Sequence, residues 1–133
     1  MDLDLTGRHA LVCGASEGIG RATAHELAQL GASVTVLARR ADALRSVVDA
    51  LPRAQSQAHR ILAVDMDDTA GLRETIGAHV AAHPVQILIN NTGGPAGGSA
   101  HDAPVDAFEA AFRRHLIGGQ VLVQAVLPAM RAA

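Results

Sequence analysis

The sequence predicts a doubly wound α/β fold, in which four parallel strands in the order 3-2-1-4 carry helices on both faces. Two observations support this prediction. Short apolar runs of strand length alternate with segments whose apolar residues recur at helical spacing, and the joints between them are short. Consecutive strands joined in this way lie parallel, through right-handed crossovers. The 133 residues are enough for one domain, residues 1–133, with one core.

The first half of the chain predicts two strand-helix pairs. Apolar residues from Ile19 onward recur at positions i, i+3, i+4, i+8 and i+11, which is one face of a helix, and Gly31 stops it. Pro52 ends the next helical pattern. The predicted elements are a strand at 9–13, a helix at 19–30, a strand at 34–38 and a helix at 44–51.

The second half continues the alternation. Asp68 or Thr69 is placed to cap a helix. Residues 85–89 are all apolar except one, as expected for a strand that is covered on both faces. The predicted elements are a strand at 61–64, a helix at 72–80, a strand at 85–89 and, after a glycine-rich loop, a long helix at 105–131. The apolar stripe of the long helix comprises Phe108, Phe112, Leu116, Leu122, Val126 and Met130.

Three glycines, Gly14, Gly18 and Gly20, lie where the first strand gives way to the first helix. Glycines let the backbone approach a ligand closely, and the first N–H groups of a helix attract phosphate, so this turn predicts a dinucleotide site. The same residues fit G-x-S-x-G, the nucleophile elbow of hydrolases, with Ser16 as nucleophile. Only about a dozen residues precede Ser16, too few for the earlier strand that supplies the second oxyanion donor. A third interpretation is an ordinary turn of a βα unit.

Composition excludes several classes of protein. A net charge of −2 gives no basic footprint for nucleic acid. The start of the chain is acidic, unlike a signal peptide, and no apolar stretch reaches the length of a membrane span. The single cysteine, Cys13, suits a reducing compartment. We therefore expect a cytoplasmic protein without nucleic-acid or membrane partners. All 11 basic residues are arginine, and the chain has no tyrosine or tryptophan.

Two motifs resemble those of the short-chain dehydrogenases/reductases. Gly14-Ala15-Ser16-Glu17-Gly18-Ile19-Gly20 is similar to the glycine motif of that family, and Asn90-Asn91-Thr92-Gly93 to its Asn-Asn-Ala-Gly motif, with threonine for alanine. The spacing of the motifs, Asp65 after the third strand and Leu127-Pro128 in the long helix also match. The resemblance implies an NAD(P)-binding domain of Rossmann type over essentially the whole chain, in a protein that acts on a small-molecule carbonyl or alcohol.

The same resemblance implies a set of cofactor-binding residues. Asp65 and Met66 would border the adenine, and Asn91 and Gly93 would contact the adenosine ribose, whereas Asn90 would tie neighbouring strands together. For Asp65 the alternative is a carboxylate that closes a turn. The full set is Gly14, Ser16, Glu17, Gly18, Ile19, Gly20, Arg39, Asp65, Met66, Asn91 and Gly93.

The end of the second strand favours NADP(H) over NAD(H). A NAD-specific enzyme places an acid there for the ribose 2′-OH, whereas an arginine pairs with a 2′-phosphate. Ala38 occupies the place of the acid, and Arg39 and Arg40 follow it. Glu17 argues the other way, because a carboxylate near a phosphate is repulsive.

The catalytic residues of the resembled family are missing. The family uses a tyrosine, a lysine, a serine and an asparagine, and its pattern places the first two beyond a fifth strand, past Ala133. His115 stands at the place of the asparagine, where it would join a proton relay or pack at a subunit contact. We expect a fold incomplete relative to the family, truncated after the long helix at 104–132. The alternative is a stand-alone NADP(H)-binding or regulatory module without catalysis.

Two further expectations concern metals and assembly. His79 and His83 have the i, i+4 spacing of metal ligands, but no third ligand accompanies them, so we expect a solvated helix end and no metal site. The long helix carries Phe108, Phe112, Leu116 and Val123, which need cover, and in the resembled family this helix packs against its copy, so we expect a homo-oligomer formed through it.

Overall fold

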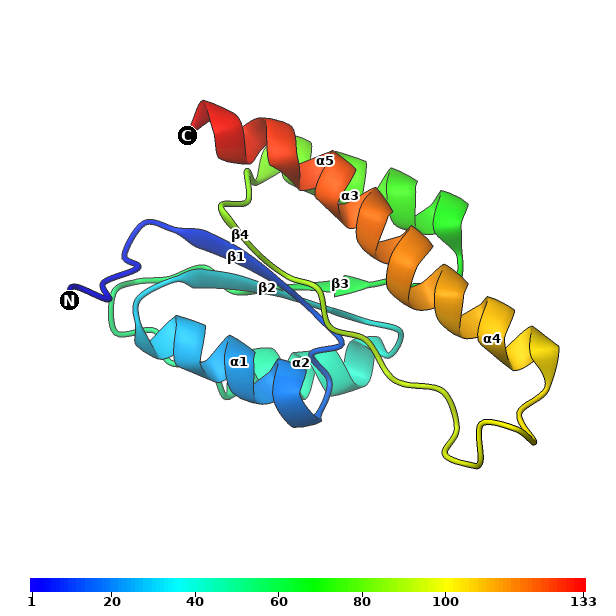
Figure 1. Ribbon diagram of the computed structural model, residues 1–133. Coiled ribbons are helices and arrows are strands. Elements are labelled where there is room, and N and C mark those ends of the chain that lie inside the picture. Colours follow the sequence, from blue (N-terminus) through cyan, green and yellow to red (C-terminus); the bar gives the residue numbers. More distant parts are fainter.

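The computed structural model describes residues 1–133 as one parallel sheet between two layers of helices (Figure 1). The strand order is β3-β2-β1-β4, which confirms the predicted 3-2-1-4 arrangement. Helices α1 and α2 cover one face of the sheet, and α3 and the C-terminal helices cover the other (Figure 1). The strands are β1 His9–Cys13, β2 Ser33–Ala38, β3 Arg60–Ala63 and β4 Ile87–Ile89.

Every predicted helix is present, with ends that differ by at most three residues. Of the two predicted capping residues, Asp68 is the N-cap of α3, and its carboxylate accepts a hydrogen bond from the Gly71 N–H at 3.0 Å. None of the helices combines the length and the apolar character needed to cross a membrane. The helices are α1 Gly18–Gln29, α2 Ala41–Asp49, α3 Thr69–Ala82, α4 Val105–Phe112, the π-helical turn η1 Arg113–Ile117 and α5 Gly118–Ala132.

Apolar residues on both faces of the sheet form two cores. Strand residues alternate between the faces because successive side chains point in opposite directions. Val12 and Val36 face α1 and α2, whereas Leu11 and Leu37 face α3 and α5, and all four are fully buried. A sheet covered on both faces is what the uninterrupted apolar runs of the strands predict.

Strand β4 is shorter than predicted, Ile87–Ile89 instead of 85–89. Just before the start of β4, Gln86 makes hydrogen bonds to β1. Its N–H donates to the His9 carbonyl at 2.9 Å, and its side-chain carbonyl accepts from the His9 N–H at 2.8 Å. Val85 is fully buried beside it. The apolar run is therefore longer than the strand because burial and strand pairing end at different residues.

The predicted stripe of the long helix is wrong as a single face. Phe112 and Leu116 are each 56% exposed, whereas Leu122 and Val126 are buried in the core that faces α3. The π-helical turn η1 lies between the two groups. Because a π turn contains more residues than an α turn, it rotates the apolar positions that follow it.

The interpretation of His79 and His83 as a solvated helix end is also wrong. His79 Nε2 lies 3.1 Å from Thr35 Oγ1, which in turn lies 2.7 Å from His9 Nε2. The rings of His79 and His83 are 5.2 Å apart, and those of His79 and His9 are 5.5 Å apart. The three imidazoles form a half-buried cluster, called here the histidine cluster. It lies at the amino-terminal edge of the sheet, where β1 begins.

Candidate functional site

The strand register brings four loops to one edge of the sheet. Cys13 pairs with Leu37, and Ala38 with Ala63, so the carboxyl ends of β1, β2 and β3 lie side by side. Strand β4 ends level with β1, because Val12 pairs with Ile89. The segments that follow these strands therefore surround one crevice, which is where doubly wound sheets bind ligands.

The turn between β1 and α1 has a shape that favours glycine. Gly14 and Gly18 have φ angles of +58° and +55°. A Cβ on Gly20 would collide with the carbonyl oxygen of Gly14, and a Cβ on Gly14 would lie 2.7 Å from the Asn91 side-chain nitrogen. Helix α1 thus begins in direct contact with the end of β1.

No side chain caps the N-terminus of α1. The N-cap residue, Glu17, is extended and makes no side-chain hydrogen bond to the helix. The first N–H groups of a helix have no partners within it, so they are free to donate to a ligand. They lie at the edge of the crevice, where the helix dipole favours an anion.

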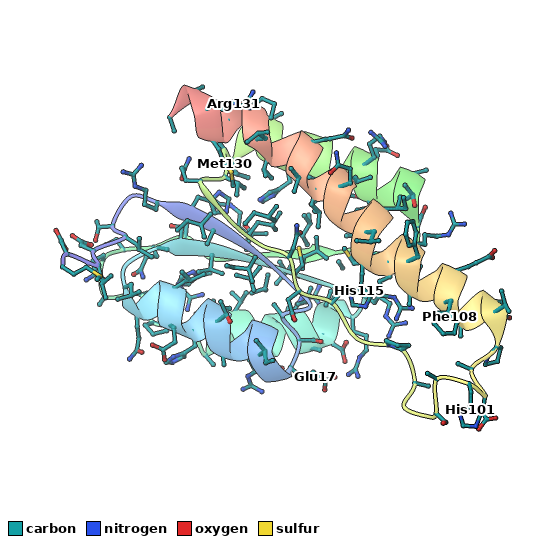
Figure 2. All side chains as sticks on the ribbon, viewed as in Figure 1. Glu17, His101, Phe108, His115, Met130 and Arg131 are labelled. Carbon is teal, nitrogen blue, oxygen red and sulfur yellow. The ribbon has the colours of Figure 1, made fainter.

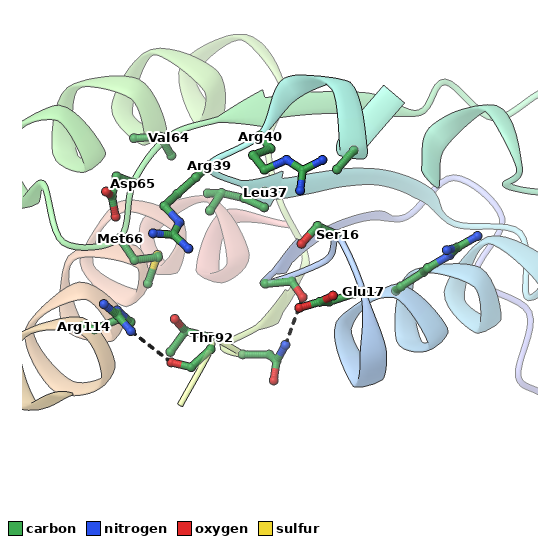
Figure 3. Close-up of a pocket in the computed structure, with 16 residues that line it drawn as sticks. Ser16, Glu17, Leu37, Arg39, Arg40, Val64, Asp65, Met66, Thr92 and Arg114 are labelled. Carbon is green, nitrogen blue, oxygen red and sulfur yellow. Dashed lines mark hydrogen bonds between the residues drawn. The ribbon is translucent and has the colours of Figure 1, made fainter. Parts of the chain in front are cut away.

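Asn91 joins the ends of β1 and β4. Its side-chain amide donates to the carbonyls of Cys13 and Gly14, both at 3.3 Å, and the second of these bonds is dashed in Figure 3. The predicted strand tie is therefore made by Asn91 and not by Asn90, whose side chain lies 3.7 Å from a Cβ built on Gly119. Asn91 also faces the crevice, so one residue both fixes the turn and lines the site.

The crevice holds a cavity of about 570 Å³. Eight of the eleven predicted cofactor-binding residues line it, whereas Gly18, Ile19 and Gly20 do not. Gly20 packs against the backbone of Gly14 and so supports the turn without lining the cavity. The side chain of Ile19 is 78% exposed. The lining residues drawn in Figure 3 are Gly14, Ser16, Glu17, Arg21, Leu37, Ala38, Arg39, Arg40, Ala43, Val64, Asp65, Met66, Asn91, Thr92, Gly93 and Arg114.

The two arginines after β2 differ in their partners. Arg40 donates to the Asp42 carboxylate at 3.2 Å, which raises the pKa of the guanidinium and lowers the pKa of Asp42. Arg39 makes no side-chain hydrogen bond or ion pair, and it extends into the cavity (Figure 3). Arg39 is thus the uncompensated cation at the end of β2. Glu17 lines the opposite part of the cavity, and its charge acts on Arg40.

The turn-closing alternative weighed for Asp65 is present in the structure, and the adenine contact stays a prediction. One of its carboxylate oxygens accepts a hydrogen bond from the Asp67 N–H at 2.9 Å, which closes the turn after β3. The side chain also lines the cavity. Next to it, Met66 is only 8% exposed, and its terminal methyl lies 3.0 Å from a Cβ built on Gly118. Contact with α5 therefore fixes one wall of the cavity.

Arg114 lines the cavity, although nothing in the sequence indicated it. Its Nε donates to one Asp67 carboxylate oxygen at 2.9 Å and its Nη2 to the other at 2.6 Å, which is the two-pronged geometry of a strong ion pair. Its Nη1 donates to the Gly93 carbonyl at 3.4 Å (Figure 3). Asp67 and Arg114 are 47 residues apart, so no local pattern could have joined them.

The cavity contains no general acid suited to neutral pH. No histidine lines it, and the chain has no tyrosine or lysine. His115 is exposed in the turn η1 and does not line the cavity (Figure 2). Ser16 also lines the cavity. The nucleophile-elbow alternative requires a histidine that acts as the base for Ser16, and no histidine lines the cavity. The arrangement suits binding of an anionic ligand.

A family model described as short chain dehydrogenase matches residues 8–133. D-erythrulose reductase of Gallus gallus is 41% identical over 90 residues, which are 68% of this chain and 33% of that protein. The crystal structure of L-sorbose reductase from Gluconobacter frateurii, complexed with NADPH and L-sorbose, superposes with a TM-score of 0.88 at 26% identity. A metagenomic short-chain oxidoreductase in complex with NADP gives 0.84 at 33% identity.

The two structural matches cover nearly all of this chain, and every match covers only part of the relative. The alignments span 99% and 96% of this chain, against 51% of the L-sorbose reductase chain and 58% of the metagenomic chain. This chain, which contains the glycine turn, the Asn91 tie and the strand order, therefore spans only part of the length of the relatives it matches. On its motifs, its fold and the family match, the chain belongs to the short-chain dehydrogenase/reductase family.

Proposed function

We propose that residues 1–133 act as one domain, the NADP(H)-binding portion of a short-chain dehydrogenase/reductase. In this proposal the whole protein transfers hydride between NADP(H) and a carbonyl or alcohol carbon of a small molecule. Family membership and solved relatives with bound NADPH or NADP support it. The reducing cytoplasm is part of the same proposal, since the one cysteine is buried and free.

The observation that carries the proposal is the free cation at the end of β2. Arg39 lines the cavity without a partner, while Ala38 stands where a NAD-specific site has its acid. A ribose 2′-OH would find no carboxylate at this point. A 2′-phosphate would find a guanidinium that no side chain of this chain hydrogen-bonds, and a phosphate oxygen is a strong acceptor for it.

The other residues fit the rest of the same ligand. The glycine turn is a cradle that a Cβ would fill, with the free N–H groups of α1 beside it for the pyrophosphate. Asp65 would accept from the adenine amino group, and Met66 would pack against the ring. Asn91 and Gly93 would contact the adenosine ribose. The nicotinamide ring would supply or accept the hydride, and this chain's own residues would bind and orient the dinucleotide.

A second candidate is a stand-alone module that binds NADP(H) without catalysis. Within these 133 residues no tyrosine or lysine is present to transfer a proton, so the binding site can be considered apart from catalysis. Sequencing the gene around the codons for this chain separates the two candidates. A reading frame that continues past Ala133 with a tyrosine and a lysine supports the oxidoreductase, and a stop codon there supports the module.

Assembly through the long helix belongs to the proposal as well. Val105, Phe108, Phe112 and Leu116 are 56% to 79% exposed along α4 and η1. Large apolar side chains that gather on one surface mark contacts between proteins. We propose a second copy of the chain as the partner.

Calorimetric titration with NADPH and NADH tests the cofactor assignment. The chain should bind NADPH about tenfold more tightly, the value of one charge-assisted hydrogen bond, and the ratio should shrink as salt rises. Arg39→Ala should remove most of the preference. Arg45→Ala is the matched control, because Arg45 is an exposed arginine of α2 that does not line the cavity. Equal affinities of the unmodified chain for the two cofactors would contradict the assignment of Arg39.

A further inference from the structure

The carboxylates of Asp65 and Asp67 lie on the same loop, beside the cavity that Arg39 enters. Asp67 is close enough for the positive charge of Arg39 to act on it, and the pKa of its carboxyl is lowered, first by the hydrogen bonds from Arg114 and further by the charges of Arg39 and Arg113. A free carboxylate in this position would compete with a phosphate for Arg39, and it would repel the phosphate directly.

Arg114 prevents this competition geometrically. Two of its nitrogens bind both oxygens of Asp67, at 2.9 and 2.6 Å, so the carboxylate is held against the turn η1. The third nitrogen is tied to the Gly93 carbonyl at 3.4 Å. The side chains of Arg114 and Asp67 are only 27% and 36% exposed, which limits competition from water. Arg39 is left without an acid partner although two acids lie near it.

We propose that Arg114 is a specificity-determining positioning residue: by holding Asp67 it keeps Arg39 free for the 2′-phosphate of NADP(H). The inference rests on the proposed function and deepens it, because it names what sets the cofactor preference. Arg114 acts through Arg39 and Asp67, and the proposal requires no contact between Arg114 and the phosphate. Arg39 and Arg114 extend into the same cavity, from the end of β2 and from η1 (Figure 3).

A simple structural clamp makes a different prediction. The ion pair joins the loop after β3, the loop after β4 and the long helix, so its loss could loosen the whole site. That effect would weaken NADPH and NADH equally. The proposed effect changes their ratio, because only NADPH carries the 2′-phosphate that Arg39 receives.

Three variants of the 133-residue chain separate these possibilities by calorimetric titration with NADPH and NADH. Arg114→Leu frees Asp67, and the NADPH-to-NADH affinity ratio should fall about two- to fivefold, the value of an exposed ion pair. The double variant Arg114→Leu with Asp67→Asn removes the freed carboxylate and should restore the ratio. Arg45→Leu changes the net charge as much as Arg114→Leu does, but Arg45 is exposed on α2 and does not line the cavity, so the ratio should hold.

The outcomes are distinguishable. A ratio that stays constant in Arg114→Leu, with both affinities lowered together, overturns the inference in favour of a clamp and leaves the proposed function standing. A ratio that falls in the single variant and stays low in the double variant also overturns it, because Asp67 is then not the competitor. If the unmodified chain binds neither cofactor, or binds both equally, the proposed cofactor assignment fails and the inference fails with it.

Discussion

The histidine cluster predicts that the chain loses stability in mild acid. His9 Nδ1 lies 3.1 Å from the Pro84 carbonyl, which can only accept, so this nitrogen carries the hydrogen. His9 Nε2 must then accept from the Thr35 hydroxyl, and Thr35 Oγ1 accepts from His79 Nε2–H. In this chain of hydrogen bonds both imidazoles are neutral. Protonation of both would leave the Thr35 hydroxyl hydrogen without either acceptor.

Burial is the main cause that lowers the pKa of His9 and lowers that of His79 from 6.5 to about 4. Arg60 carries a positive charge that lowers both pKa values further, and each neighbouring imidazole acts in the same direction once it is protonated. Above pH 6.5 the unfolded and folded chains are both neutral at these sites. Below pH 6.5 these histidines bind protons in the unfolded chain but stay neutral in the folded chain. The free energy of unfolding therefore falls as the pH is lowered to about 4.

For one histidine whose pKa drops from 6.5 to about 4, the loss between neutral pH and pH 5 is about 2 kcal/mol. Solvent screens a half-buried site, so we expect roughly 1 kcal/mol from His79. Urea unfolding at pH 7.5 and pH 5 measures it. His79→Gln should reduce the difference between the two pH values by that amount, and His25→Gln, on the surface of α1 with a side chain 46% exposed, should not. The same pH dependence in the unmodified chain and in His79→Gln would refute the reasoning.

Two further predictions follow from the packing. Gly20→Ala places a methyl group against the Gly14 carbonyl and should weaken NADPH binding at least about tenfold by calorimetry. The control Gly77→Ala, whose Cβ would have nothing within 4 Å, should leave binding unchanged and stabilise α3 by about 0.5–1 kcal/mol. Equal binding by both variants would be inconsistent with the cradle. Leu122→Ala, at a fully buried position, should lower the free energy of unfolding in urea by about 2–5 kcal/mol. Leu127→Ala, at a position that is 36% exposed, should lower it by less than about 1 kcal/mol. Similar losses in the two variants would contradict the placement of α5.

Local patterns were sufficient to predict the sheet and most of the cavity. The glycine turn and the Asp68 cap each depend on residues close together in sequence, and the strand order follows from the alternation of strands and helices through right-handed crossovers. Where parallel strands end determines which loops meet, so Arg39 and Asp65 could be placed at one crevice before their contacts were known.

The features that the sequence did not predict depend on contacts between distant segments. His79 meets Thr35 across 44 residues, and Arg114 meets Asp67 across 47. Neither pair has a repeating pattern, because a single side-chain contact leaves no periodicity. The turn η1 left no trace in the apolar pattern, because the six residues of the stripe all fall on one face of an uninterrupted α-helix.

The central claim is that the glycine turn and Arg39 bind a dinucleotide with a 2′-phosphate. Backbone and arginine side-chain N–H chemical shifts of the ¹⁵N-labelled chain, followed during titration with adenosine 2′,5′-bisphosphate and with 5′-AMP, test it most directly. We predict shifts at residues 14–20 with both ligands, and at the Arg39 side chain with the bisphosphate alone. Shifts confined to the separate cavity of about 380 Å³ between residues 95–104 and α4, or identical shifts at Arg39 with both ligands, would contradict the claim.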